Sequence, residues 1–346
     1  MPSRRFRRLW SFLLATTVIL GMASICVQGA IQDDKLLLKS FDAANGVTLP
    51  YRLYVPETIA MDQPLPVLLF LHGAGERGND NSLPLITDCE LLNRIMNEPD
   101  RYPCILVIPQ CAQDAQWVDT PWSEGNYSVD EIPMSRYLAA VKELLSSLEE
   151  EYSIDPGRRY ITGLSMGGFG TWDMIMRYPR TFAAAIPICG GGDPTQAPRL
   201  LDIAIRTYHG SADTAVPVAG TRTMAAAMEL YDAPLFAYTE IAGADHGIWG
   251  DIYRREETAE WLFAQRRDES LLFWGDPDQD NRVTANDALL ALQHSVGLTA
   301  LRYEDADVAD VNADGQIDAS DALWMLQHSV GLIDHFPAQE EPDQRA

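Results

Sequence analysis

The residues best suited to chemistry are in "GLSMGG" (163–168), which holds Ser165 in a Gly-x-Ser-x-Gly pattern. The run "RRYITGL" before the serine predicts a strand and the residues after it predict a helix, so Ser165 is expected at a sharp strand-to-helix turn. Gly163 and Gly167 allow that turn to be tight. A serine hydroxyl is a poor nucleophile until a base takes its proton. The pattern therefore predicts nucleophilic catalysis and requires a partner base.

His246 is the predicted base. It lies in a loop after the last predicted strand, downstream of the serine, where a hydrolase of this chain order has its histidine. His72 precedes a glycine-rich loop that it is expected to shape, and His209 ends a strand in which it is expected to be packed. The other three histidines belong to the C-terminal segment: His294, His328 and His335.

Asp213 is the predicted acid that orients His246. It stands in "HGSADTAVP", just past the strand that precedes the histidine. Asp245 is the rival, but the side chains of neighbouring residues rarely face each other. The order Ser165, Asp213, His246 is the order of the triad in α/β-hydrolases.

Backbone N–H groups are expected to hold the oxyanion of a tetrahedral intermediate. Met166 follows the nucleophile and should supply one of them. The second should come from the loop after the apolar run 65–73, from Ala74 or alternatively from Gly75. A phosphate-binding loop is the other interpretation of "HGAGERG", but the stretch lacks the Lys-Ser/Thr ending and the spacing of a P-loop.

The elements that would position these residues alternate between strands and helices. The continuous apolar runs 65–73 and 104–110 are typical of strands buried on both faces, and residues 135–152 have helical periodicity. This order predicts an α/β fold, with a mostly parallel sheet and helices on both faces. The other expected elements are a hairpin at 36–55, strands within 182–191, 203–213 and 235–247, and helices at 219–233 and 254–267.

Four blocks, "LFLHGAGERGNDN", "ITGLSMGGFGTW", "HGSADTAVP" and "DHGIW", resemble secreted serine esterases related to feruloyl esterases, acetyl-xylan esterases and polyhydroxybutyrate depolymerases. Proteins with the sequence "HGAGERG" are often labelled peptidases. The resemblance covers residues 36–265. It implies an α/β-hydrolase fold with Ser165, Asp213 and His246 as the triad, and it leaves the substrate open.

Aromatic faces can bind a sugar or a ferulate. Trp249 lies three residues after His246 and is therefore the first candidate for substrate contact, followed by Trp117 and Trp122. Trp172 is expected in the core.

Residues 275–298 and 309–332 repeat each other at an offset of 34, and "LQHSVGL" recurs unchanged. Each repeat begins with oxygen-bearing residues at positions 1, 3, 5, 7, 9 and 12, the ligand spacing of an EF-hand calcium loop. Position 6 is Asn281 in the first loop and Gly315 in the second. Both loops end in Asp, and neither shows the helix that precedes an EF-hand loop. The predicted ligands are Asp276, Asp278, Asp280, the carbonyl of Arg282, Thr284 and Asp287, and then Asp310, Asn312, Asp314, the carbonyl of Gln316, Asp318 and Asp321.

Two loop-helix repeats with Asp at position 12 resemble a type I dockerin over residues 275–332. The resemblance implies two bound calcium ions and a cohesin module of a scaffold protein as partner, an arrangement that usually assembles plant-cell-wall enzymes. The paired contact positions differ from the Ser-Thr of some dockerins, which leaves the cohesin type open. A calcium-stabilised tail without a partner is the alternative. The implied contact residues are Ala285, Asn286, Gln293, His294, Ala319, Ser320, Gln327 and His328.

The N-terminus has the order of a secretory signal peptide: "MPSRRFRRLW", an apolar run, then "QGAIQDD". Cleavage is expected near Gly29 or Ala30. An uncleaved anchor is the alternative, and the bulky Ile25 disfavours a lipoprotein site at Cys26. Removing residues 1–30 takes away four Arg and no acid, which changes the formal net charge from −24 to −28. Such a charge argues against nucleic acid or an anionic membrane surface as partner.

Four cysteines remain after cleavage and could form two disulfides or stay as buried free thiols: Cys89, Cys104, Cys111 and Cys189.

These features predict a signal peptide at 1–30, an α/β-hydrolase catalytic domain at 31–268, a small α-helical dockerin at 269–336 and a disordered tail at 337–346. The predicted function is a secreted, extracellular serine carboxylesterase that hydrolyses acetyl or feruloyl esters on a plant cell-wall polysaccharide such as xylan, without a cofactor for catalysis. A serine peptidase of the same fold, a generic carboxylesterase and a non-enzymatic binding module are the alternatives.

Overall fold

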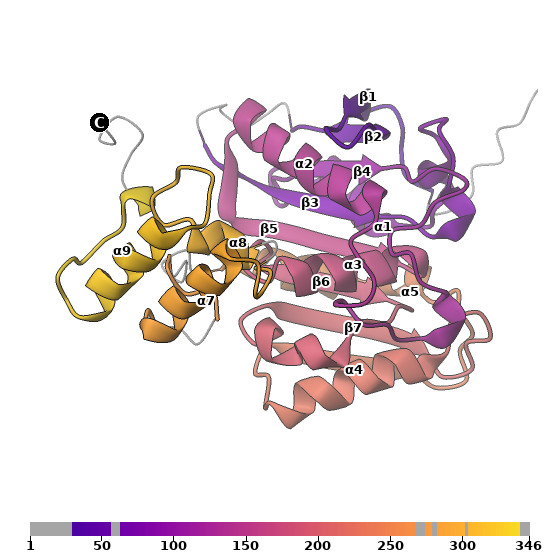
Figure 1. Ribbon diagram of the computed structural model, residues 1–346. Coiled ribbons are helices and arrows are strands. Elements are labelled where there is room, and N and C mark those ends of the chain that lie inside the picture. The colour runs from indigo at the N-terminus through magenta and orange to yellow at the C-terminus, as the bar shows by residue number, and fades with distance from the viewer. Residues whose placement is uncertain (1–29, 57–62, 268–273, 279–281, 302–303, 340–346) are drawn as a thin grey trace, which may run out of the picture.

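The apolar runs of the sequence become the central strands of one eight-stranded sheet (Figure 1). The computed structural model describes residues 30–56, 63–267, 274–278, 282–301 and 304–339. The strand order is β1-β2-β4-β3-β5-β6-β7-β8. Strands β1, β2 and β4 pair antiparallel, and all other neighbours pair parallel. The strands are β1 Leu37–Asp42, β2 Thr48–Tyr54, β3 Leu65–Leu71, β4 Ile105–Pro109, β5 Ile154–Leu164, β6 Ala184–Ile188, β7 Ala204–Gly210 and β8 Phe236–Ile241.

Helices cover both faces of this sheet, because its central strands are apolar on both sides. In β3, Val67 and Leu69 belong to one core cluster, whereas Leu68 and Phe70 belong to the other. The first cluster includes residues of α2, α3 and α4, and the second includes residues of α1, α5 and α6. The mostly parallel α/β sheet predicted from the sequence is confirmed. The helices are α1 Glu90–Asn97, α2 Arg136–Glu151, α3 Met166–Arg177, α4 Val218–Leu230, α5 Trp249–Arg254 and α6 Glu256–Phe263.

The helical segment near the end of this body differs from the prediction. The prediction of a single helix at 254–267 is wrong, because Arg255 has extended backbone (φ −67°, ψ 129°) and separates α5 from α6. Helix α6 then ends at Phe263. The predicted hairpin at 36–55 is confirmed as β1 and β2, and Gly46 takes a positive φ of 80° in its turn.

The C-terminal segment forms a second, small helical core. Helices α7 (Ala285–Ser295) and α9 (Ala319–Ser329) pack on each other around Ala291, Met325 and Phe336. A six-residue helix, α8 (Glu304–Ala309), directly precedes the second loop, so the expectation that neither loop has a preceding helix is wrong there. The prediction of a disordered tail from residue 337 is wrong for Pro337–Gln339, which form a short 3-10 turn (η6). The N–H of Ala338 in this turn donates to Val311 O. Residues 340–346 lie outside the described residues, as do 1–29 of the predicted signal peptide.

In the described part of the chain, ion pairs connect the small helical core to the hydrolase body. Arg180, which follows α3, lies 3.3 Å from Asp276, and Arg199 lies 2.8 Å from Asp305. The predicted boundary at residue 268 lies outside the described residues.

All four cysteines of the predicted mature chain are free and buried, so the disulfide alternative is wrong: Cys89, Cys104, Cys111 and Cys189. Within the described residues, no helix has the length and apolar character needed to cross a membrane.

Candidate active site

Ser165 occupies the sharp turn between β5 and α3. Its backbone has φ 55° and ψ −120°, a conformation that costs a non-glycine residue of order 1–3 kcal/mol. Its N–H donates a 2.8 Å hydrogen bond to Ile188 O at the end of β6, which helps to hold the strained turn. A Cβ on Gly167 would lie 1.9 Å from Leu71 O, and one on Gly163 would lie 2.4 Å from Gly167 O. The glycines are therefore needed for close backbone approach at the turn.

His246 and Asp213 complete a hydrogen-bonded chain from this serine. The Nε2 of His246 lies 2.8 Å from Ser165 Oγ, and its Nδ1 lies 2.6 Å from Asp213 Oδ2. The other oxygen of Asp213 accepts hydrogen bonds of 2.8 Å from Ala215 N–H and of 2.8 Å from Val216 N–H. Burial favours a raised pKa for Asp213, but the hydrogen bonds from His246, Val216 and Ala215 outweigh it and lower that pKa. The carboxylate is thus held ionised beside the imidazole.

The rival acid, Asp245, does not contact the His246 ring. Its Oδ1 accepts instead from the backbone N–H groups of Thr214, at 3.1 Å, and of His246, at 2.9 Å. The structure therefore pairs the ring with Asp213, as the sequence predicts.

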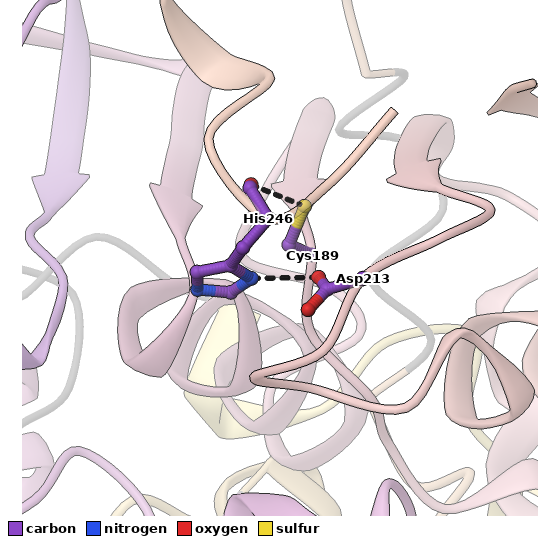
Figure 2. A group of neighbouring side chains, drawn as sticks. All are labelled: Cys189, Asp213 and His246. Atoms are coloured by element: carbon purple, nitrogen blue, oxygen red, sulfur yellow. Dashed lines mark hydrogen bonds and ion pairs between the residues drawn. The ribbon is translucent and has the colours of Figure 1, made fainter. Parts of the chain in front are cut away.

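A buried thiol lies beside the His246–Asp213 pair (Figure 2). Cys189 directly follows β6 with a positive φ of 50°, and its Sγ donates to His246 O at 3.3 Å. Burial raises the pKa of this thiol to about 12, so it is protonated and unsuited to act as a nucleophile. The pair Ile188–Cys189 thus contacts both the nucleophile turn and the loop of the base.

The predicted oxyanion donors flank the serine. Met166 is the first residue of α3, where amides have no acceptor within the helix. Ala74 and Gly75 belong to a 3-10 turn, η1 (Ala74–Glu76), directly after β3. A Cβ on Gly73 would lie 2.9 Å from Leu164 Cδ1, so this loop is packed beside the residue that precedes Ser165. Both loops therefore lie beside the serine, as an oxyanion site requires.

His72 has the loop-shaping role expected of it. It is fully buried, and its Nε2 accepts a 3.0 Å hydrogen bond from Cys111 N–H. Burial lowers the pKa of His72 to about 4, which keeps the ring neutral.

The three candidate tryptophans have different surroundings. Trp249 is partly exposed, and its ring meets that of His246 edge-on with centroids 5.5 Å apart. Trp122 lies in the turn η3 (Trp122–Glu124) and packs partly buried against a small cluster that includes Phe169. The prediction that Trp117 contacts substrate is wrong: it is 0% exposed, and its Nε1 donates to His72 O at 3.0 Å.

Sequence reasoning missed His209. It is fully buried at the end of β7, and its Nε2 lies 3.0 Å from Asp213 Oδ2. The sequence predicts a packed strand residue, and no sequence signal shows which carboxylate a buried ring will meet.

The first predicted calcium loop brings three of its carboxylates together. Oxygen atoms of Asp276, Asp278 and Asp287, at loop positions 1, 3 and 12, lie within 4.8 Å of one another. Asp280 lies outside the described residues. Arg282 is exposed, and Thr284 caps α7 by accepting from Asn286 N–H at 3.1 Å.

The second loop curls around its own acidic side chains. Asp310 accepts from Asp314 N–H at 3.1 Å and from Gly315 N–H at 2.9 Å, and Gly315 takes a positive φ of 84°. The buried Asp321 accepts from Asn312 N–H at 3.3 Å and from Asp318 N–H at 2.9 Å. Burial raises the pKa of Asp321 and of its counterpart Asp287. Such oxygen-rich loops fit the ligand preference of calcium, and Gln316 lies exposed among these ligands.

The predicted partner-contact residues fall at equivalent places in the two repeats. Those at the helix starts are exposed, and those near the helix ends are partly buried. Leu292 and Leu326 between them are 38% and 39% exposed, so the two faces match closely. The residues at the starts are Ala285, Asn286, Ala319 and Ser320, and those near the ends are Gln293, His294, Gln327 and His328.

Comparison with known proteins agrees with this geometry. The family model named Esterase matches residues 44–302, which is more than half of the chain. The chain belongs to the Esterase family. The family match runs past residue 268 and through the first repeat of the tail.

Several proteins resemble this Esterase-family chain. A crystallised thermostable esterase is 37% identical with a TM-score of 0.61, over 68% of this chain and 64% of that one. The feruloyl esterase module from Clostridium thermocellum is 15% identical with a TM-score of 0.47, over 70% and 96% of the chains, which says nothing about substrate. A stretch of 52 residues is 46% identical to poly(3-hydroxyalkanoate) depolymerase C of Paucimonas lemoignei, over 15% of this chain and 13% of that protein. The chain thus spans 64% of the thermostable esterase and 13% of the depolymerase.

Proposed function

We propose that the chain is a secreted serine carboxylesterase that hydrolyses acetyl or feruloyl esters on a plant cell-wall polysaccharide such as xylan. The observation that carries the proposal is the hydrogen-bonded series Ser165–His246–Asp213, at 2.8 and 2.6 Å, in a member of the Esterase family. The strained serine turn between β5 and α3 is the arrangement that exposes a nucleophile in this fold.

The reaction follows from the positions of these atoms. His246 Nε2 takes the proton of Ser165 Oγ as Oγ attacks the ester carbonyl carbon, and the N–H groups of Met166 and Ala74 hold the oxyanion. His246 then gives the proton to the departing alcohol oxygen, the ester C–O bond breaks, and an acyl-enzyme remains. A water attacks the acyl carbon, loses a proton to His246, and releases the acid as Ser165 regains its proton.

Asp213 makes His246 effective as a base. Its ionised carboxylate accepts from His246 Nδ1, which leaves Nε2 free to face the serine and stabilises the imidazolium that forms. The partly exposed Trp249 next to His246 is the surface against which we expect the acyl or sugar group to lie. Trp122 is a second such candidate.

The tail is proposed to be a type I dockerin that binds two calcium ions and a cohesin module of a scaffold protein. The clustered carboxylates of the first loop, the backbone N–H groups that point at Asp310 and Asp321 in the second, and the matched exposed faces of α7 and α9 support this. Attachment would keep the esterase near polysaccharide and near partner glycosidases, which raises effective concentration. This is the reason to favour wall polysaccharide over lipid or peptide as substrate.

The substrate is tested by measuring acid release from acetylated xylan and from feruloylated arabinoxylan, with casein as a peptide control and Ser165→Ala as the blank. Acetate or ferulate that is absent from the blank supports the proposal and chooses between the two esters. Cleavage of casein alone would favour a serine peptidase. Hydrolysis of small soluble esters alone would favour a generic carboxylesterase.

Attachment is tested separately by titrating a type I cohesin into the full chain with and without EDTA. Binding that needs calcium supports the dockerin. Introducing arginine at Leu292 and Leu326 together should abolish binding if these faces form the contact. Binding unaffected by the double change would contradict the proposed surface.

A further inference from the structure

His209 approaches the Asp213 carboxylate that His246 also uses. Its Nε2 lies 3.0 Å from Asp213 Oδ2 and 3.1 Å from Val216 O. His246 Nδ1 lies 2.6 Å from the same Oδ2. One carboxylate oxygen therefore lies within hydrogen-bond distance of two imidazole rings.

The neighbours of His209 determine where its ring carries a proton. Asp213 Oδ2 and Val216 O are both acceptors that have no proton to give. A bare Nε2 would point its lone pair at two oxygens in a buried site, where unpaired polar groups are costly. The geometry therefore requires an N–H at Nε2, which Val216 O and Asp213 Oδ2 share.

The opposite side of the ring is held by α4. With the ring proton on Nε2, His209 Nδ1 accepts a 2.6 Å hydrogen bond from the Thr221 hydroxyl, and Thr221 Oγ1 also lies 2.6 Å from Gly190 O. Gly190 follows Cys189 beyond the end of β6, so the ring connects β6, β7 and α4. Burial lowers the pKa of His209, while its contacts with Val216 O and Asp213 act in the opposite direction.

We propose that His209 is a positioning residue, whose Nε2–H holds the Asp213 carboxylate in the orientation that His246 needs. The inference rests on the proposed function, because it gives a task to the Asp213–His246 pair. Two backbone N–H groups hold Oδ1 of Asp213, and His209 adds to His246 a second contact on Oδ2 that fixes the rotation of the carboxylate.

The hydrogen bond from His209 also reduces the negative charge on the Asp213 oxygen that faces His246. An N–H from His209 draws electron density from Oδ2, so its loss should leave a more negative oxygen facing His246 Nδ1 and favour the imidazolium. The other charged groups that face His209 are His246 itself and Glu240, which pairs with it in register on β8 and is held by Arg222 of α4.

The test compares His209→Leu with His209→Gln in the full chain, on p-nitrophenyl acetate. Leucine removes both ring nitrogens, whereas the glutamine amide can still donate to Asp213. We expect His209→Leu to lower kcat about 10-fold or more with little change in KM, short of the about 10²–10⁴-fold that a whole general base contributes. The acidic limb of its kcat/KM profile should move to higher pH. His209→Gln should keep most of the unsubstituted kcat, and the acidic limb of its kcat/KM profile should lie at the pH of the unsubstituted chain. The inference would be overturned if folded His209→Leu had an unchanged kcat and an acidic limb at the same pH as the unsubstituted chain.

A measurement on the unsubstituted chain covers the case in which His209→Leu does not fold. In ¹⁵N-histidine NMR, with His209 assigned by the loss of its signals in His209→Gln, a protonated Nε2 supports the inference and a bare Nε2 overturns it. Ser165→Ala separates the two proposals. If Ser165→Ala keeps full activity, the proposed function fails. If Ser165→Ala is inactive but the His209 variants and the NMR measurement contradict a protonated Nε2 that holds Asp213, only this inference fails.

Discussion

Ser165 Oγ and His246 Nε2 lie 2.8 Å apart although 81 positions of sequence separate them. The contact depends on parallel pairing, which places the ends of β5 and β8 at the same edge of the sheet. The serine is presented by the turn that ends β5, and the histidine by the loop that follows β8. Between them, the end of β6 contacts both, through Ile188 O and Cys189 Sγ.

Replacing Asp213 by Asn should lower kcat by about 10⁴-fold, because an amide can no longer hold His246 in the tautomer that leaves Nε2 free. Asp245→Asn is the matched control. Among the described residues, the hydrogen bonds to its carboxylate come from two backbone N–H groups and the Thr214 hydroxyl, so the change should lower kcat much less. Steady-state kinetics on a soluble ester compares the two. A larger loss for Asp245→Asn would reverse the assignment of the acid.

Trp249→Ala should weaken substrate binding and leave the fold intact, because the ring is partly exposed beside His246. An aromatic contact of about 1 kcal/mol corresponds to roughly a five-fold rise in KM. The fully buried Trp117 serves as contrast: Trp117→Ala should cost about 3–5 kcal/mol of unfolding free energy. Kinetics and denaturant unfolding separate these effects. An unchanged KM in Trp249→Ala would remove it from the substrate site.

Calcium removal should unfold the small helical core and spare hydrolysis of a soluble ester. Binding energy of the ions becomes folding energy when the loops are not preformed without them. Trp274 and Trp324 pack against this core and can report its unfolding in EDTA by fluorescence.

The number of ions can be checked by native mass spectrometry. Asp321→Ala removes a buried position-12 carboxylate and should reduce two bound calcium ions to one. Asp334→Ala, an exposed acid of the same segment outside both loops, should keep two. Equal stoichiometry in the two variants would contradict the ligand assignment.

Acid should weaken the hydrolase body through Asp155. Burial raises the pKa of Asp155, but hydrogen bonds from Arg266 and Arg158 prevail and hold that pKa below its ordinary value. Such a carboxylate stabilises the fold above its ordinary pKa, and this contribution is lost as pH falls through the depressed value. Asp155→Asn should therefore have a lower Tm at neutral pH, and the two Tm curves should converge on acidification. A gap that stays constant with pH would refute this explanation.

The hydrogen-bonded arrangement of Ser165, His246 and Asp213 could be predicted because its signals are local and its chain order is constrained. The turn around Ser165 is encoded by two glycines, and Asp213 and His246 each follow a recognisable strand. Asp213 could be preferred to Asp245 because adjacent side chains point apart in an extended loop, and the structure agrees.

The role of His209 could not be predicted, because it depends on which groups meet a buried ring after β7, α4 and a loop have packed. The burial of Trp117 could not be predicted for a similar reason: its loop packs into the core next to His72. Helix α1 did leave a signal that was overlooked. Its buried residues recur at helical spacing: Leu91, Leu92, Ile95 and Met96.

The central claim is that Ser165 is the nucleophile of an esterase, and covalent labelling tests it most directly. The full chain would be treated with a fluorophosphonate, and the adduct located by peptide mass spectrometry while ester hydrolysis is followed. The account predicts one adduct, on Ser165, that forms in step with loss of hydrolysis and is absent from His246→Ala on the same time scale. Complete loss of hydrolysis with the adduct on another residue, or full hydrolysis by a chain labelled at Ser165, would contradict it.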